Sequence, residues 1–503
     1  MWLMGVDIGT TGVKAAVFNP DGDMLAYGFH EYDVICEKPG YAEQDAELVW
    51  KYVKEVMSST ASKVNGEITA ISISTQGDAV IPMDKQCNAL CYAQLGMDYR
   101  AVKETAEISK LIGERTLFTQ TGIRPHPLNS LVKMMWFERN LPNLKKKLWK
   151  YATYADFILA KMGSDEPVID LTMASRTMCL DIKTNQWSKD ILSAAGIDVS
   201  FLSKPVPSGT LVGHLRTDLC NELGIKLGAK LVAGGHDQTC AALGAGLVRE
   251  NVALDSHGTA EVLSTAFNKP RLDDVMFNSY YPCYRHVVPN MYFTFALNHV
   301  GGILLKWYRD NLGYAEVVEA EKTGERAFEK IVVMTPNGPS PLLVLPHFNG
   351  SGTPTCDINS KGAILGLTMS STRHDIAKGI LDSTAFELRI NIETMRKAGI
   401  NIQQLLCVGG GARSPIDLKL KADVTGIPVS TLRVREAACL GAAILAGMGA
   451  GVYDNVSDAI SCVKTDTTYY PDDKMHDRYN EKYAVYTSLY EALKETNSKI
   501  KSW

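Results

Sequence analysis

The feature that most constrains this chain is a motif that occurs twice, about 250 residues apart. In the first copy an apolar strand leads through Asp7 into the turn Gly9-Thr10-Thr11, and a second apolar strand ends at Phe18. Residues 252–267 repeat the order of strand, acidic residue, Gly-Thr turn and strand. Two strands joined by such a turn form a hairpin. The repeat favours two related halves over three unrelated domains.

Length and periodicity agree with two α/β domains. At roughly 150 residues per domain, 503 residues allow two large domains or three smaller ones. The repeat places the boundary near residue 248, so we expect domains over 1–247 and 248–503. Strands and helices alternate, which predicts the α/β class. Helical spacing of apolar residues occurs at 46–61, 130–140, 415–425 and 436–448, and strand patterns at 68–74 and 405–408.

Composition narrows the class of protein. The 52 basic and 56 acidic residues give a net charge of −4, whereas a nucleic-acid-binding protein usually has a basic excess. The eleven cysteines form no C-x-x-C pair, which indicates reduced thiols. We find no secretion signal at the N-terminus and no run of about 20 apolar residues. These observations predict a cytoplasmic protein that binds neither nucleic acid nor membranes.

The first motif has the chemistry of a triphosphate site. Gly9 allows close approach to a phosphate, Thr10 and Thr11 supply hydroxyls and amides, and Lys14 supplies positive charge. Asp7, at the end of the strand, is placed to hold Mg²⁺ directly or through water. The alternative is an ordinary hairpin turn capped by an aspartate. The second turn favours the phosphate site, because two such turns can face each other across one nucleotide.

A further acidic residue follows a glycine turn in the first half. Residues 231–243 predict a strand, the turn Gly234-Gly235 and a helix that begins near Asp237. Taken alone, an aspartate at this position is most often a helix N-cap.

Taken together, residues 5 to about 450 resemble the FGGY family of carbohydrate kinases, in the superfamily of actin, hexokinase and Hsp70. The resemblance is carried by the two turns and by three further motifs: Ser130-x-x-Lys133-x-x-Trp136, Gly362-x-x-x-Gly366-Leu367 and Gly409-Gly410-Gly411-Ala412. It implies two ribonuclease-H-like domains with the active site in the cleft between them. It also implies phosphoryl transfer from ATP to a hydroxyl of a small sugar or polyol.

The resemblance assigns roles to individual residues. Asp237 matches the general base, an acid that orients the attacking hydroxyl and takes its proton late. Asp7 and Asp237 are the expected Mg²⁺ ligands. The acceptor would be held by Gln76, Asp78, Asp98, Asp237 and Gln238. ATP would be held by Gly9, Thr10, Thr11, Lys14, Gly258, Thr259, Gly302, Gly410, Gly411 and Ala412.

The acceptor segment departs from familiar members of the family. Xylulokinases commonly have Gln-Met-His-Gly where this chain has Gln76-Gly77-Asp78-Ala79, and a tryptophan where it has Gly96. Glycerol kinases have an Arg-Glu pair in place of Gly77 and Asp78. The acidic residues favour a neutral acceptor, a ketopentose such as xylulose or a related polyol.

Two other functions stay open from the sequence. One is an aldonate kinase of the gluconate type, for which Arg100, Arg124 and His126 are nearby cations. The other is an actin-like or Hsp70-like ATPase without a sugar acceptor, against which the polar segment 75–100 argues. The resemblance is also compatible with a homodimer.

Overall fold

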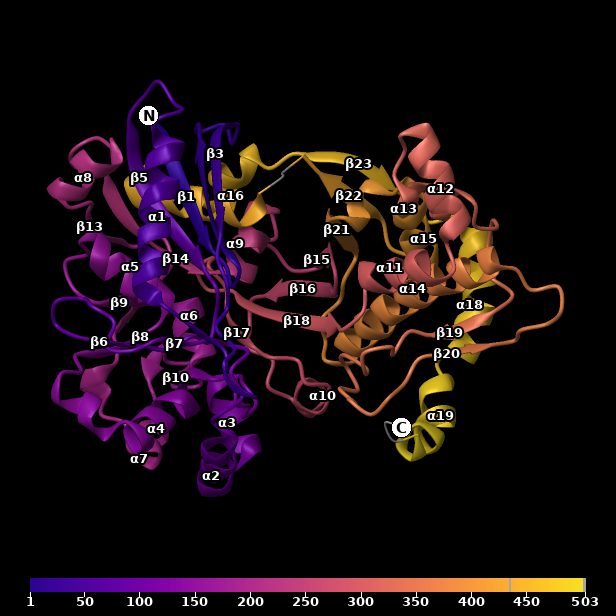
Figure 1. Ribbon diagram of the computed structural model, residues 1–503, viewed down its shortest axis with the longest axis horizontal. Coiled ribbons are helices and arrows are strands. Elements are labelled where there is room, and N and C mark those ends of the chain that lie inside the picture. Colours follow the sequence, from indigo (N-terminus) through magenta and orange to yellow (C-terminus); the bar gives the residue numbers. More distant parts are fainter. Residues whose placement is uncertain (434–435, 501–503) are drawn as a thin grey trace.

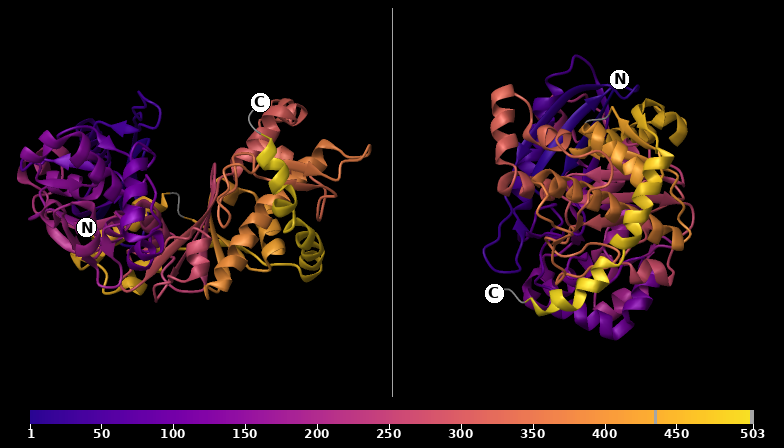
Figure 2. Two further views of the ribbon diagram at one scale, coloured as in Figure 1. Left: turned by 90° about the horizontal axis from the view of Figure 1, so that it is seen from below. Right: turned by 90° about the vertical axis from the view of Figure 1, so that its right-hand side faces the viewer.

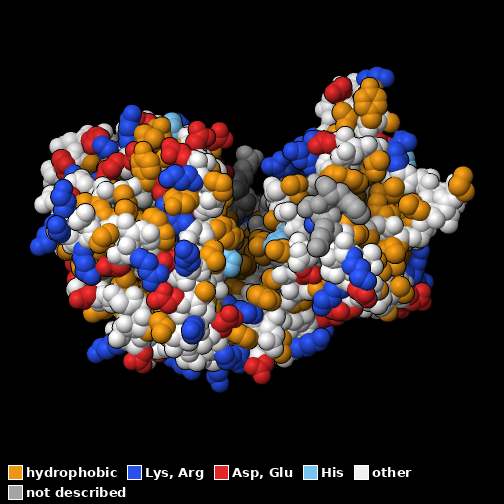
Figure 3. All heavy atoms as spheres, turned by 60° about the horizontal axis from the view of Figure 1, so that its bottom comes forward, with side chains coloured by type: hydrophobic (Ala, Val, Ile, Leu, Met, Phe, Trp, Pro, Cys, Tyr) orange, Lys and Arg blue, Asp and Glu red, His pale blue; other side chains and the backbone are white. Residues whose placement is uncertain are grey.

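The computed structural model describes residues 1–433 and 436–500. It consists of two lobes joined along one side, and the molecular surface is hollowed between them (Figures 1, 2 and 3). Each lobe is built on a mixed β-sheet with helices packed against it. The predicted α/β class and the two-lobed architecture are therefore confirmed.

The sheet of the first lobe has six strands. Strand β1 pairs antiparallel with β2 and parallel with β5, and β5 pairs parallel with β14. In spatial order the strands are β13 (Leu211–His214), β14 (Lys230–His236), β5 (Ile68–Thr75), β1 (Trp2–Ile8), β2 (Gly12–Phe18) and β3 (Met24–Glu31).

The second sheet repeats this order with an additional edge strand. Strand β15 pairs antiparallel with β16 and parallel with β21, which pairs parallel with β22. The order is β17 (Tyr284–Arg285), β18 (Tyr292–Asn298), β16 (Glu261–Phe267), β15 (Val252–His257), β21 (Gln404–Gly409), β22 (Val429–Leu432) and β23 (Thr465–Tyr469). The two predicted hairpins are thus β1–β2 and β15–β16, at equivalent places in two related sheets.

Helix α1 illustrates how local sequence fixes an element. Asp45 caps its N-terminus by accepting from the amides of Glu47 and Leu48. Val49, Val53 and other apolar residues at helical spacing are buried, and α1 packs on β2 and β3. The first-lobe helices are α1 (Ala46–Ala61), α2 (Val102–Ile112), α3 (Glu114–Thr121), α4 (Ser130–Asn140), α5 (Tyr154–Met162), α6 (Leu171–Arg176), α7 (Lys189–Ala195), α8 (Thr217–Leu223) and α9 (Asp237–Gly244).

The second lobe contains most of the remaining helices, the longest of which is α14 (Figure 1). They are α10 (Asp274–Asn278), α11 (Gly302–Asn311), α12 (Tyr314–Thr323), α13 (Ala327–Val333), α14 (Arg373–Lys397), α15 (Pro415–Thr425), α18 (Asp473–Tyr486) and α19 (Leu489–Lys499). The short pair β19 (Leu343–Leu345) and β20 (Ala363–Leu365) lies beside them. Among the described helices, we find none with both the length and the apolar character of a membrane span.

Helix α16 (Ala437–Ala450) belongs to the second half of the sequence but packs in the first lobe, against β1, β5 and β14. It also packs tightly against α9. A Cβ atom at Gly5 would lie 1.9 Å from the carbonyl oxygen of Cys439, and one at Gly441 would lie 1.9 Å from that of Cys240. The small residues in these elements, glycine above all, therefore allow the backbones of α16, α9 and β1 to approach closely.

Candidate active site

The first Gly-Thr turn is held by side chains from three other segments. The Tyr32 hydroxyl donates to the carbonyl oxygen of Gly9 at 2.7 Å, and Gln44 Nε2 donates to that of Thr10 at 2.5 Å. Gln76 Oε1 accepts from Thr10 Oγ1 at 3.1 Å, while its Nε2 donates to Gln44 Oε1 at 3.1 Å. Gln76, predicted to bind the acceptor, therefore supports the phosphate turn in this structure.

Asp7 and Lys14 are register partners across the hairpin that carries this turn. Ser74 Oγ donates to Asp7 Oδ1 at 2.7 Å. Burial raises the pKa of Asp7, against the effects of Ser74 and Lys14. The ammonium of Lys14 lies 2.8 Å from Glu436 Oε2, directly before α16. The cation predicted to meet a phosphate is thus paired with a carboxylate from the second half of the chain.

Asp237 begins α9 directly after β14, as predicted, but the predicted turn at Gly234-Gly235 is wrong because both glycines lie within the strand β14. Its Oδ1 accepts from the amide of Gln238 at 2.6 Å and lies 3.3 Å from His236 Nε2. The side chain is 31% exposed. Burial, and next the charge of Asp7, raise the pKa of Asp237 to about 7. A carboxylate with one oxygen held and a raised pKa is suited to accept a proton.

Asp78 lies in the same region, on a segment with unusual geometry. Its φ of 64° is in the left-handed region, which aspartate tolerates better than most residues. Arg176 Nη2 donates to Asp78 Oδ2 at 2.5 Å, and Lys133 Nζ donates to the Asp78 carbonyl oxygen at 2.8 Å. A Cβ at Gly77 would lie 2.7 Å from the ring of His236. The glycine that distinguishes this segment is therefore required by the neighbouring histidine.

Asp98, another predicted acceptor ligand, has both carboxylate oxygens engaged by the protein. Arg100 Nη2 donates to Asp98 Oδ2 at 2.6 Å and Arg100 Nε to Oδ1 at 2.9 Å, while the Ala42 amide donates to Oδ2 at 2.8 Å. The Arg100 guanidinium also contacts Glu43 at 2.7 Å and lies 3.6 Å from the centre of the Tyr41 ring. Asp98 thus orients Arg100 here.

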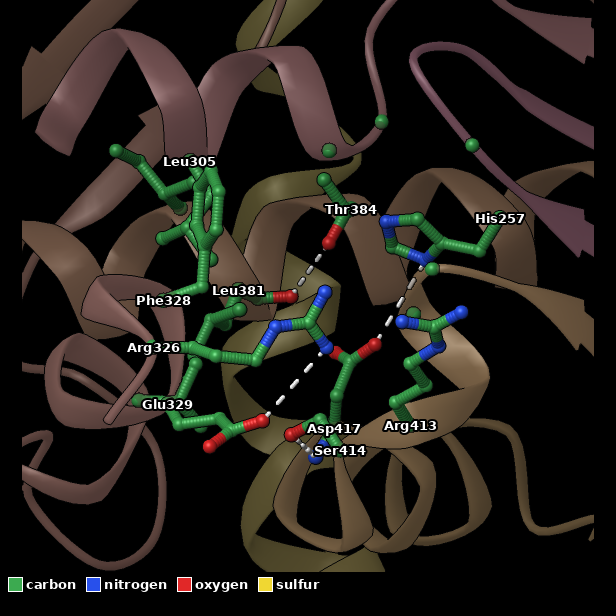
Figure 4. A pocket seen from close by; sticks show the side chains of 17 residues that line it. His257, Leu305, Arg326, Phe328, Glu329, Leu381, Thr384, Arg413, Ser414 and Asp417 are labelled. Atoms are coloured by element: carbon green, nitrogen blue, oxygen red, sulfur yellow. Dashed lines mark hydrogen bonds and ion pairs between the residues drawn. The ribbon is translucent and has the colours of Figure 1, made fainter. Parts of the chain in front are cut away.

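A cavity of about 270 Å³ opens beside the second Gly-Thr turn (Figure 4). It brings together Gly258, Gly302, Gly410 and Gly411, four of the residues predicted to bind ATP. Thr259 and Ala412 do not line it, and all its lining residues fall within 257–417. A Cβ at Gly411 would lie 2.5 Å from His257 Cγ, so this segment needs glycine to pass the histidine ring.

A buried cluster lies directly behind this cavity. Potential ligand atoms of Asp255, His257 and Glu261 lie within 4.8 Å of one another, a spacing that suits a metal ion. Lys421 Nζ is instead at their centre, 2.6 Å from Asp255 Oδ2, 2.7 Å from His257 Nδ1 and 2.8 Å from Glu261 Oε1. Although burial opposes it, the Lys421 ammonium holds the pKa of Glu261 well below its usual range. An ammonium group therefore occupies this position.

Several residues of the site were not predicted. Arg176, Tyr284 and Glu436 lie in none of the motifs that the sequence offered. For Lys421 a signal existed, because Asp417 lies four residues earlier on the same predicted helix and both are polar positions in a buried segment. Lys133 was noted in a motif, but not its contact with Asp78.

Comparison with known proteins agrees with this geometry. Models of the FGGY family of carbohydrate kinases match twice, the N-terminal domain at residues 2–244 and the C-terminal domain at residues 254–450. The chain is 27% identical to a xylulose kinase of Bacillus subtilis, over 100% of this chain and 99% of that protein.

Two solved structures from Lactobacillus acidophilus share the fold. The ligand-bound xylulose kinase has a TM-score of 0.89 at 23% identity and covers 99% of this chain and 100% of its own. The gluconate kinase has a TM-score of 0.90 at 23% identity and covers 99% of each chain. With family models matching most of its length, the chain belongs to the FGGY family of carbohydrate kinases, enzymes that transfer a phosphoryl group from ATP to a small sugar-like acceptor.

Proposed function

We propose that this kinase phosphorylates a ketopentose, xylulose or a close relative, with Asp237 as the general base. The observation that carries the proposal is the position of Asp237 beside the Asp78–Arg176 pair, with one carboxylate oxygen held by the Gln238 amide. Among the described residues, its other oxygen has no protein donor, which leaves it for an acceptor hydroxyl. Full-length similarity to a xylulose kinase supports the choice of acceptor.

In this mechanism the protein contributes mainly position and charge. Asp237 orients the acceptor hydroxyl in line with the γ-phosphorus and receives its proton as the new P–O bond forms. The cavity beside Gly258 and Gly410 would hold the nucleotide. Because that cavity is lined only by the second half of the chain, the turn at Gly9–Thr11 must approach when the lobes close.

Asp7 and Asp237 fit a Mg²⁺ site. They are carboxylates from neighbouring segments, the charge of Asp7 raises the pKa of Asp237, and Asp7 is oriented by Ser74. Bound Mg²⁺ would neutralise charge on the transferring phosphoryl group. The Asp255 cluster does not fit a metal, because Lys421 already supplies its positive charge.

An aldonate such as gluconate is the second candidate. The three cations noted in the sequence argue against it. Arg100 is paired with Asp98 and Glu43, and Arg124 lies 3.1 Å from Glu114. Burial lowers the pKa of His126, which keeps its ring neutral. None of these three side chains therefore offers an unpaired positive charge to a carboxylate substrate.

The test is a coupled assay of the purified protein with Mg·ATP against ketopentoses, ketohexoses, pentitols and aldonates. We expect xylulose to have the highest kcat/KM. Asp237→Ala should lower kcat on that acceptor by on the order of 10²–10⁴ while nucleotide affinity is kept. Near wild-type turnover by this variant would remove Asp237 from the role of base.

A further inference from the structure

Four buried polar atoms beside Asp237 have no hydrogen-bond partner among the described residues. They are Asp78 Oδ1, Arg176 Nε, His236 Nδ1 and Tyr284 Oη. The side chains come from separate parts of the sequence, and each residue is at most 8% exposed. A buried polar atom without a partner costs about 1–3 kcal/mol, so such atoms are rare in native proteins. Several in one place indicate a polar ligand.

The four side chains form one contiguous group. Arg176 joins Asp78 through its Nη2, and its guanidinium carbon lies 5.4 Å from the centre of the Tyr284 ring. The rings of His236 and Tyr284 are perpendicular, with centres 5.8 Å apart. His236 in turn contacts Asp237. The unpartnered atoms therefore belong to one group of neighbouring side chains next to the proposed base.

The group is held rigidly from behind. Asp170 caps α6, the helix that ends with Arg176, by accepting from the amides of Thr172 and Met173. Thr172 Oγ1 accepts from the amide of His236 at 2.8 Å. One short helix thus fixes both Arg176 and the end of the strand that leads to Asp237.

We propose that Arg176 and Tyr284 determine acceptor specificity by donating hydrogen bonds to a carbonyl oxygen of the acceptor, while Asp78 Oδ1 accepts from an adjacent hydroxyl. The inference rests on the proposed function and deepens it. A ketose offers this combination, whereas a pentitol replaces the carbonyl with another hydroxyl. An aldonate adds a negative charge that Arg176, already balanced by Asp78, does not neutralise.

Lys133 does not supply the positive charge that an aldonate would need. Its Nζ donates to the backbone carbonyl oxygens of Asp78 and Leu128 at 2.8 and 2.6 Å. Burial lowers its pKa to about 7. The side chain supports the Asp78 segment and is occupied by those two carbonyl groups.

The sharpest test is Tyr284→Phe, which removes only the unpartnered hydroxyl. Tyr308→Phe is a matched control, because the Tyr308 hydroxyl is also buried without a partner but lies on α11, in the second lobe. We expect Tyr284→Phe to raise KM for xylulose about 10-fold, to leave KM for ATP within about twofold, and to reduce the preference for xylulose over xylitol. Arg176→Lys should reduce the same preference, because lysine keeps the charge but lacks the second donor.

Xylulose binding to the variants, measured by calorimetry with a non-hydrolysable ATP analogue, gives a readout independent of turnover. Thermal unfolding establishes that each variant is folded. If Tyr284→Phe behaves like Tyr308→Phe, or changes xylulose and xylitol equally, the specificity role is wrong while xylulose kinase activity stands. A wild-type preference for gluconate over xylulose would overturn the proposed acceptor and this inference together.

Discussion

The two Gly-Thr turns occupy equivalent places in related sheets, yet their acidic residues differ in surroundings. Asp7 is partly exposed, accepts one hydrogen bond from Ser74 and faces the ionisable groups of the proposed active site. Asp255 is fully buried, and Lys421 donates to it at 2.6 Å. The same strand position therefore carries a partly exposed carboxylate in one lobe and a buried ion pair in the other.

The two lobes share the position of the turn but differ in the side chains that hold it. Both lobes need a fixed turn at the end of the central hairpin. In the second lobe the Lys421 cluster fixes the turn by joining β15, β16 and α15 beside the cavity that we propose for the nucleotide. In the first lobe neutral side chains, Gln44 and Gln76, hold the turn, and Asp7 accepts a hydrogen bond from the neutral hydroxyl of Ser74.

The largest expected effect is on stability, in Lys421→Met. Removing the ammonium leaves the carboxylates of Asp255 and Glu261 buried without a counter-charge, which typically costs about 3–5 kcal/mol. Urea unfolding should report this loss. Lys419→Met is the matched control on the same helix, since Lys419 is 42% exposed and pairs with Asp423. It should cost no more than about 1 kcal/mol. Equal losses in the two variants would show that the cluster adds no special stability.

The next effect is on activity, in Asp7→Asn. We expect turnover to fall by on the order of 10²–10³, because charge neutralisation at the phosphoryl group is worth several kcal/mol. The free energy of unfolding should change by less than about 1 kcal/mol, as burial already disfavours this carboxylate. Asp255→Asn should do the reverse, losing stability while the Mg²⁺ dependence of the rate is kept. If both variants lose activity in parallel and keep their stability, the contrast between the turns is wrong.

The smallest effect concerns the Lys14–Glu436 pair. Both side chains are partly exposed, so Glu436→Gln should change stability by at most about 1 kcal/mol. If the pair competes with phosphate for Lys14, the variant should lower KM for ATP by up to about fivefold. Steady-state kinetics with ATP varied measures this. A raised KM would mean instead that Glu436 positions Lys14 for the nucleotide.

Much of the fold was predictable because it depends on local patterns. Helical spacing placed the helices at 46–61, 130–140 and 415–425 with the bounds that the structure gives to α1, α4 and α15. The repeated turn predicted the two equivalent sheets. The packing of α16 in the first lobe was not predictable, since nothing local indicates which sheet a helix of small residues will cover.

The site residues also divide into those set by local sequence patterns and those set by the tertiary fold. The positions of Asp237 and of the glycines beside the cavity follow from motifs that keep strand, turn and helix together. The partners of Gln76 and Asp98 do not, because a polar side chain in a loop can bind a ligand or another part of the chain. Arg176 and Tyr284 come together only through the tertiary fold, from positions 108 residues apart.

Because α16 packs on β1, β5 and β14, the first lobe is completed by residues 437–450. During synthesis its central sheet therefore lacks this cover until almost nine tenths of the chain has been made. A fragment that ends near residue 247 would expose apolar strand surface to solvent and to other chains. The first lobe therefore cannot complete its fold until the second half of the chain, which contains α16, has been synthesised.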